Sequence, residues 1–208
     1  MQDALLPLFP LQVVLFPGGE LPLHIFEDRY KEMIGEVLRD KREFGVILAN
    51  EKGVVKTGCT ATVDKVLRRY PDGRLDIVTR GRRRFEIMRL NDERVFLRGT
   101  VEFFDDDEAA PASPEIQKLA VDGYNEMQDL ASDPRLAPEQ TANPQLSFQL
   151  AQEVPDLSLR QLLLSTRSEA ERLRHLASFF PSYLQKQRRL QQVRDLAPRN
   201  GHSHEPTE

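Results

Sequence analysis

The densest group of side chains able to bind a ligand is the basic run Arg80-Gly81-Arg82-Arg83-Arg84. Guanidinium groups bind phosphate oxygens through paired hydrogen bonds, so such a run can hold the backbone of RNA. A hairpin formed with the preceding segment would bring further arginines to the same patch. The resulting RNA-binding hypothesis names four residues: Arg68, Arg69, Arg82 and Arg83.

The competing interpretation of this basic run is a solvated strand edge, where charge blocks pairing with other sheets. Asp76 and Glu86 dilute the patch, and the chain carries 29 Lys and Arg residues against 33 Asp and Glu, a formal net charge of −4 at pH 7. Binding to phosphates falls steeply with salt unless many contacts form. We therefore do not expect nucleic acid to be a partner.

Motifs for catalysis are missing: the sequence has no Gly-x-x-x-x-Gly-Lys-Ser/Thr, no Gly-x-Ser-x-Gly and no His-Glu-x-x-His. The single cysteine, Cys59, is interpreted as a small buried hydrophobic residue in a strand. His202 and His204 could chelate a metal, but stable sites need three or four ligands that are held in place. We predict no catalytic, cofactor or metal site, and hence a protein that is not an enzyme.

Composition favours a globular protein of the cytoplasm. The 208 residues are 39% hydrophobic and 30% charged, without a run of 18 apolar residues, so we expect no membrane span. The first residues resemble no signal peptide, and one cysteine cannot form an internal disulfide, which suits a reducing compartment.

The first half of the chain has the pattern of a small sheet or barrel with one inserted helix. Strands are expected in these segments: Pro7–Leu15, Leu21–Phe26, Phe44–Ala49, Cys59–Tyr70, Arg74–Arg80, Phe85–Leu90 and Arg94–Phe104. Apolar residues spaced as on one helix face predict a helix over residues 27–40. Pro71-Asp72-Gly73 is typical of a hairpin turn.

The second half is predicted to be a bundle of short helices. Ser113-Pro114 and Asn143-Pro144 are helix starts, and Ser158 and Ser168 each begin a capping box. Pro181 must start a new helix or kink the old one. Residues 1–104 carry 18 basic and 16 acidic residues, and the remainder carries 11 and 17.

This change in charge coincides with a stretch of acids and prolines that cannot continue a strand. The predicted division is a β subdomain over residues 1–108, a helical subdomain over 109–196 and a disordered tail over 197–208.

The order of motifs in the first half resembles the N-terminal domain of the Lon protease family. The opening motifs are Leu6-Pro7-Leu8-Phe9-Pro10-Leu11, Val14-Leu15-Phe16-Pro17-Gly18 and Ile25-Phe26-Glu27-x-Arg29-Tyr30. The similarity continues through Gly58-Cys59-x-Ala61, Asp72-Gly73-Arg74, Gly81-x-x-Arg84-Phe85 and Ser147-Phe148-x-Leu150-Ala151. It covers about residues 5–195.

This resemblance implies an α+β fold, in which a mixed and antiparallel β barrel is followed by a helical bundle. The barrel would be like the pseudouridine-synthase-and-archaeosine-transglycosylase (PUA-like) type. In the family, this domain captures unfolded or degron-bearing proteins. The ATPase and Ser-Lys peptidase modules that follow it in Lon have no counterpart in these 208 residues.

Two apolar features are candidates for a peptide-binding site. Residues 5–17 hold more bulky apolar side chains than one strand face needs, so they are either core or an exposed site for an extended peptide. In the segment Arg94–Phe104, period-two alternation places Phe96 and Phe104 with Arg98, opposite a stripe from Val95 to Phe103. These three residues form our predicted peptide anchor if that face is open; otherwise helices pack on the rings.

We therefore expect non-catalytic recognition of unfolded or misfolded polypeptides. The alternatives are an RNA-binding PUA-like module and an adaptor that docks on a separate ATP-dependent protease or chaperone.

Overall fold

The computed structural model describes residues 5–51, 53–107 and 111–196, and it divides the chain into two compact units. The first unit contains Met1–Ala109 and Ser147–Ser168, and the second contains Ala110–Leu146 and Glu169–Glu208. This grouping differs from the predicted division at residue 108, because residues 147–168 belong with the strands. The predicted tail, with His202 and His204, lies outside the described residues.

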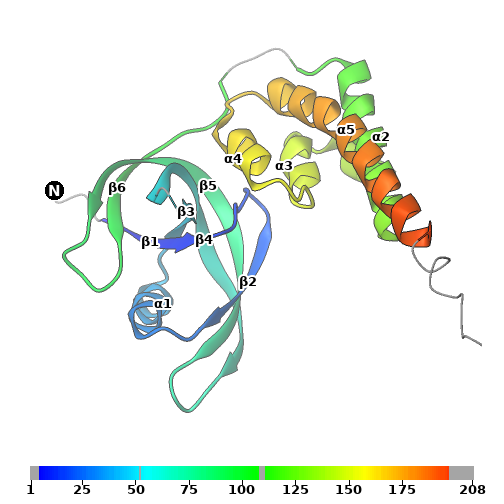
Figure 1. The fold of residues 1–208 in the computed structure, drawn as a ribbon. Coiled ribbons are helices and arrows are strands. Elements are labelled where there is room, and N and C mark those ends of the chain that lie inside the picture. The colour runs from blue at the N-terminus through cyan, green and yellow to red at the C-terminus, as the bar shows by residue number, and fades with distance from the viewer. Residues whose placement is uncertain (1–4, 52, 108–110, 197–208) are drawn as a thin grey trace, which may run out of the picture. The chain divides into compact units, whose positions relative to one another are not determined.

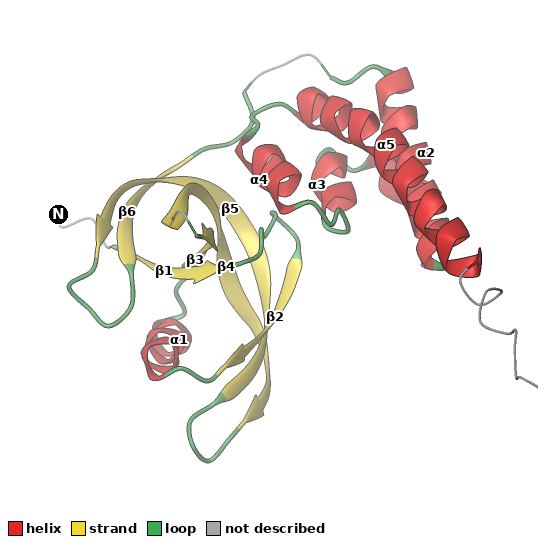
Figure 2. Cartoon of the chain, in the orientation of Figure 1, coloured by secondary structure: helices red, strands yellow, loops and turns green. Residues whose placement is uncertain are grey.

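Six strands form one mixed sheet in the first unit (Figures 1 and 2). They are β1 (Leu6–Leu11), β2 (Glu20–Ile25), β3 (Phe44–Asn50), β4 (Gly53–Arg69), β5 (Leu75–Asn91) and β6 (Arg98–Phe103). Their order is β2-β5-β4-β3-β1-β6, and β6 also pairs with β5. The β1–β3 pair is parallel and the other pairs are antiparallel. Because β6 pairs with both β1 and β5, the sheet curls until it nearly closes into a ring.

The inserted helix α1 (Asp28–Asp40) begins one residue later than predicted, with Glu27 as its N-cap, and its apolar stripe is buried. The hairpin between β4 and β5 also has the predicted turn, in which Gly73 N donates to Tyr70 O at 3.0 Å. With the helices that follow the sheet, these features confirm the predicted α+β fold.

Several strand predictions differ from the structure. The predicted strand Pro7–Leu15 ends at Leu11 in β1, and the segments Arg74–Arg80 and Phe85–Leu90 belong to the single strand β5.

The predicted strand Arg94–Phe104 was wrong in both its extent and its faces. Residues 94–97 are not in a strand, and β6 begins only at Arg98. Val95 is 62% exposed and Phe103 is 42% exposed, so the stripe assigned to the interior faces outward at both ends. A period of two indicates a buried face only where the backbone is extended throughout.

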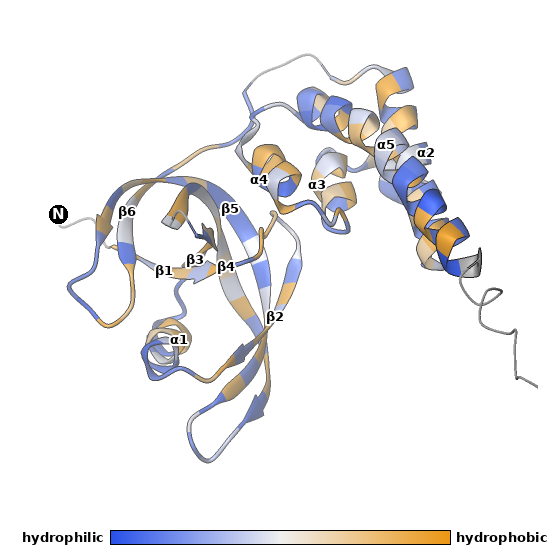
Figure 3. Cartoon of the chain, in the orientation of Figure 1, coloured by the Kyte–Doolittle hydropathy of each residue, from blue (hydrophilic) through white to orange (hydrophobic). Residues whose placement is uncertain are grey.

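Two helices of the later sequence complete the first unit. They are α3 (Leu146–Ala151), which belongs to this unit from Ser147 onward, and α4 (Leu157–Ser165). Figure 3 shows α4 as a largely hydrophobic helix. Its N-cap is Asp156, whose side chain accepts from Leu159 N at 2.9 Å, so the predicted start at Ser158 was two residues late.

The second unit consists of α2 (Pro114–Ala131), the 3₁₀ helix η1 (Pro138–Ala142) and α5 (Glu169–Leu196). Ser113 caps α2 as predicted. A Cβ on Gly123 of α2 would lie 2.6 Å from the Phe180 Cβ of α5, so only glycine permits this close packing. Pro181 lies inside α5, and no new helix begins there. No described helix combines the length and apolar character that crossing a bilayer requires.

Candidate functional site

The loop between β1 and β2 is held against the middle of β5. Gly18 N donates to Gly81 O, and Gly81 N donates to Gly19 O, both at 2.9 Å. A Cβ on Gly81 would lie 2.1 Å from the carbonyl oxygen of Phe16, so any other residue would push the loop away. The glycine within the basic run therefore fixes the position of the apolar segment Val13–Phe16.

Helices α3 and α4 hold the other side of this loop. The ring of Phe148 on α3 stacks on the ring of Phe16, with centroids 5.5 Å apart and planes inclined by 25°. Arg160 on α4 donates from Nη2 to Val14 O at 2.7 Å, and its guanidinium carbon lies 5.5 Å from the centre of the Phe16 ring. These contacts lie entirely within the first unit.

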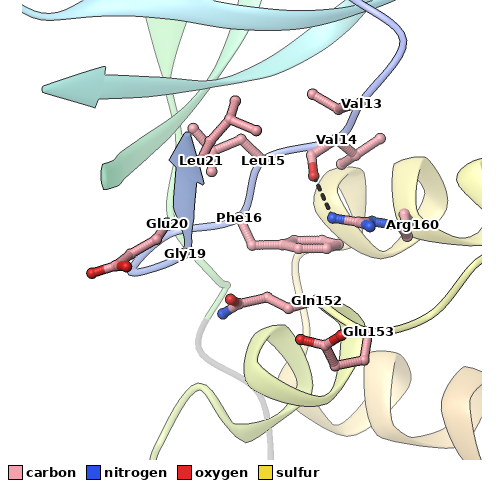
Figure 4. Close-up of a pocket in the computed structure, with 10 residues that line it drawn as sticks. All are labelled: Val13, Val14, Leu15, Phe16, Gly19, Glu20, Leu21, Gln152, Glu153 and Arg160. Carbon is pink, nitrogen blue, oxygen red and sulfur yellow. Dashed lines mark hydrogen bonds between the residues drawn. The ribbon is translucent and has the colours of Figure 1, made fainter. Parts of the chain in front are cut away.

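A pocket of about 200 Å³ lies between the loop and the two helices (Figure 4). Its lining residues are Val13, Val14, Leu15, Phe16, Gly19, Glu20, Leu21, Gln152, Glu153 and Arg160. In Figure 4 the loop and the start of β2 supply the apolar side chains, while α4 and the chain after α3 supply Arg160, Gln152 and Glu153. The pocket thus combines an apolar wall with a few polar groups, as ligand sites commonly do.

The electrostatics of the pocket centre on Arg160. Its Nε is buried without a hydrogen-bond partner, and within the described ranges no carboxylate lies within ion-pair distance of it. Burial lowers the pKa of this guanidinium, an effect that the charge of Glu153 opposes. The carboxylate of Glu20 is already paired with Arg80.

A second buried arginine, Arg84 on β5, secures α4 to the sheet. Its Nη1 donates to Thr166 O at 2.8 Å and to Leu164 O at 3.3 Å, and its Nη2 pairs with Asp106 at 2.6 Å. The guanidinium also lies over the ring of Phe148. Arg84 is therefore a structural residue that holds one wall of the pocket.

The four arginines of the RNA hypothesis are not gathered in one patch. In the β4–β5 register, Arg68 lies opposite Asp76, whereas Ala61 lies opposite Gly81, next to Arg82. On β5 these two positions are five residues apart, roughly 17 Å at 3.3 Å per residue.

Three of these four side chains have local partners. Arg68 stacks on Tyr70, Arg82 donates to Thr62 Oγ1 at 3.0 Å, and Arg83 lies 3.8 Å from the centre of the Phe103 ring. Arg69 is exposed near the end of β4. The geometry does not favour one shared phosphate-binding surface.

The predicted peptide anchor is not an open aromatic surface. Phe96 is 2% exposed and Phe104 is 8% exposed. Arg94 lies over the Phe96 ring, and the Phe104 ring has the guanidinium groups of Arg84 and Arg167 within 4.7 Å and 4.5 Å of its centre. Arg98 donates to Asn91 Oδ1 at 2.8 Å. The anchor required both rings to be open, and in the structure both are buried, with arginine side chains over them.

The sequence predicted the apolar wall of the pocket as a candidate site but did not predict Arg160. The apolar segment over residues 5–17 was singled out as either core or an exposed peptide site. Val14 to Phe16 are buried, as the first alternative expects, and they also line the pocket, while peptide binding stays a prediction. Arg160 was considered only as part of a helix start. The sequence signal that could have indicated Arg160 is a charged residue within the leucine-rich stretch Leu157–Leu164.

Cys59 lies in β4 and is fully buried, as expected of a small hydrophobic residue, and burial raises its pKa to about 12. A thiol with this pKa is not ionised near neutral pH. Across the described ranges, no cluster of three or more His, Cys, Asp or Glu side chains could hold a metal ion.

A nearly closed mixed sheet with an inserted helix, followed by a pocket-forming helix pair, defines the class of domain. The chain belongs to the family described as the ATP-dependent protease La (LON) substrate-binding domain, whose model matches residues 5–186. This match confirms the resemblance noted in the sequence.

Solved structures and curated relatives agree with this assignment. The Lon N-terminal domain protein from Xanthomonas campestris is 26% identical, with a TM-score of 0.69 over 86% of this chain and 100% of its own. The N-terminal domain of Mycobacterium avium complex Lon protease shares the fold, with a TM-score of 0.61 over 85% of this chain and 98% of its own, at 19% identity. The Lon protease of Roseiflexus castenholzii is 28% identical over 84% of this chain and 23% of its own length, and that of Parabacteroides distasonis is 29% identical over 55% and 15%. The chain thus spans less than a quarter of these two proteases.

Proposed function

We propose that this chain recognises unfolded or degron-bearing polypeptides in the cytoplasm without chemically altering them, and that the pocket beside Arg160 is a binding site. The observation that carries the proposal is the pocket itself: half-buried Val13 and Leu21 line it in a domain whose family is described as substrate-binding. Apolar side chains are what an unfolded chain exposes and a folded one hides.

The edge of β2 offers backbone groups beside the pocket. Among the described strands, β2 pairs only with β5, so its other edge has no strand paired to it. Glu20 and Leu21, at the start of this strand, also line the pocket. An extended polypeptide could therefore pair with β2 while placing one side chain in the pocket, as in strand addition to exposed sheet edges.

Binding by this route would be weak for any single sequence. A flexible polypeptide loses conformational entropy when it becomes ordered, and this cost offsets much of the gain from apolar burial. Weak and tolerant binding suits a domain that must accept many unfolded chains. The proposal includes delivery of the captured polypeptide to an ATP-dependent protease or chaperone, because the curated relatives are Lon proteases.

Replacing Val13 by Asn tests the pocket. We expect Val13→Asn to weaken binding of a fluorescently labelled, permanently unfolded casein by about fivefold or more, because the polar amide removes apolar surface from the site. Fluorescence anisotropy measures the affinity and a thermal melt measures folding.

The matched control is Val95→Asn, since Val95 is 62% exposed and does not line the pocket. It should leave casein binding unchanged. Equal affinity of the Val13→Asn variant and the unmodified chain, at equal melting temperature, would contradict the proposed site.

A further inference from the structure

The guanidinium of Arg160 has more donors than acceptors. Of its five N–H groups, one donates to Val14 O, and within the part of the chain that the structure describes no other acceptor is bonded to it. Nε is fully enclosed without a partner, whereas Nη1 is not among the enclosed unpaired atoms. The guanidinium therefore keeps a free hydrogen-bonding end at a pocket that it lines.

This guanidinium also has no ion-paired counter-ion within the described residues, and the charge of Glu153 only partly opposes the effect of burial on its pKa. Glu153 lines the same pocket but makes no ion pair with Arg160 in the described structure, and Glu20 is engaged by Arg80. A partly buried cation without a counter-ion is costly, and burial accordingly lowers the Arg160 pKa. An anion placed in the pocket would offset this cost through a charge-assisted hydrogen bond.

The remaining walls restrict what carries that anion. An apolar group is needed to cover the side chains of Val13, Leu15 and Leu21. The pocket volume of about 200 Å³ lies below the usual range for drug-sized ligands, so the pocket suits about one amino-acid residue. An internal Asp or Glu uses its only side chain as the anion and leaves the apolar wall unfilled. The last residue of a polypeptide carries its carboxylate on the same carbon as its side chain, and so supplies both groups.

We propose that this pocket binds the free C-terminus of a polypeptide that ends in an apolar residue, with Arg160 pairing with the terminal carboxylate. The side chain of that residue would lie against Val13, Leu15 and Leu21, and Gln152 and Glu153 would offer acceptors to the last peptide N–H. The inference rests on the proposed function and names the part of the substrate that is recognised.

Two peptides of identical sequence test the inference, one ending in leucine with a free carboxylate and the other ending in leucine carboxamide. The unmodified chain should bind the acid about tenfold more tightly than the amide, as measured by fluorescence anisotropy. In Arg160→Gln this preference should disappear, because a neutral glutamine side chain has no positive charge to distinguish the carboxylate from the carboxamide. The exposed Arg39 is the control, and Arg39→Gln should keep the full preference.

A second variant keeps the test decisive if Arg160→Gln unfolds. In Glu153→Gln a repelling negative charge is removed while an acceptor oxygen stays, so this variant should bind the acid more tightly and enlarge the preference for the acid over the amide. Equal binding of acid and amide by the unmodified chain, or an unchanged preference in folded Arg160→Gln, overturns the inference. An unchanged acid affinity in Glu153→Gln also counts against it. The casein assay with Val13→Asn tests the broader function separately, since casein binding can persist without any carboxyl-terminal preference.

Discussion

The guanidinium of Arg84 is buried in the first unit, where it donates hydrogen bonds to two carbonyl oxygens and to Asp106. The side chain is 4% exposed, whereas its neighbour Arg83 is 58% exposed. Adjacent members of one basic run thus have opposite roles, because successive residues of a strand point to opposite faces. The family resemblance identified Arg84 as part of a motif, and the structure explains why an arginine is needed: its planar fork reaches several acceptors at once.

Arg84→Ala should lower the free energy of unfolding by about 3 kcal/mol, because it leaves the partly buried Asp106 and two carbonyl groups without their donor. Chemical denaturation measures the change. The neighbouring Arg83→Ala is the control and should cost less than about 1 kcal/mol, since exposed ion pairs contribute little. Similar losses for both variants would contradict the structural role given to Arg84.

At the scale of elements, the pocket depends on a loop that meets a strand without any side chain between them. Gly81 and the carbonyl of Phe16 approach so closely that a methyl group cannot fit. Hydrogen bonds from Gly18 N and Gly81 N close the contact on both sides. The loop carries Val13 to Phe16, so the position of the whole apolar wall follows from this single contact.

Gly81→Ala should therefore lower the melting temperature and weaken casein binding together, because the loop must move away from β5. Gly35→Ala is a control with the opposite expectation. Gly35 lies in α1, where an added Cβ meets nothing within 4 Å, and alanine favours a helix by up to about 1 kcal/mol over glycine. A stable Gly81→Ala variant with full binding would show that the loop contact does not shape the site.

Local patterns predicted the elements whose causes are local. The apolar stripe of α1, the hairpin turn before Arg74 and the cap at Ser113 each depend on residues a few positions apart, and each is found in the structure. The alternation in residues 94–104 failed because residues 94–97 are not in a strand, so a period of two does not assign their faces. Arg160 was missed for a different reason: its partner Val14 is 146 residues away in the sequence.

At the scale of the whole molecule, the chain passes three times between its two units. It leaves the first unit after Ala109, returns at Ser147 and leaves again after Ser168. The helix α3 begins with Leu146, which is assigned to the second unit, and continues with residues of the first. Neither unit is a continuous piece of sequence, so neither can be cut out at a single boundary.

This interleaving leads to the last prediction, a single cooperative thermal transition for the full chain. The strands alone lack Phe148, which stacks on Phe16, and lack the carbonyl groups of Leu164 and Thr166 that bind Arg84. A fragment of residues 1–109 should therefore melt well below the full chain. A fragment of residues 113–208 should not fold on its own, because Ser147–Ser168 would lose the sheet on which it packs. Differential scanning calorimetry and circular dichroism measure these outcomes. Two well-separated transitions, a folded 113–208 fragment, or a 1–109 fragment as stable as the full chain would each contradict the prediction.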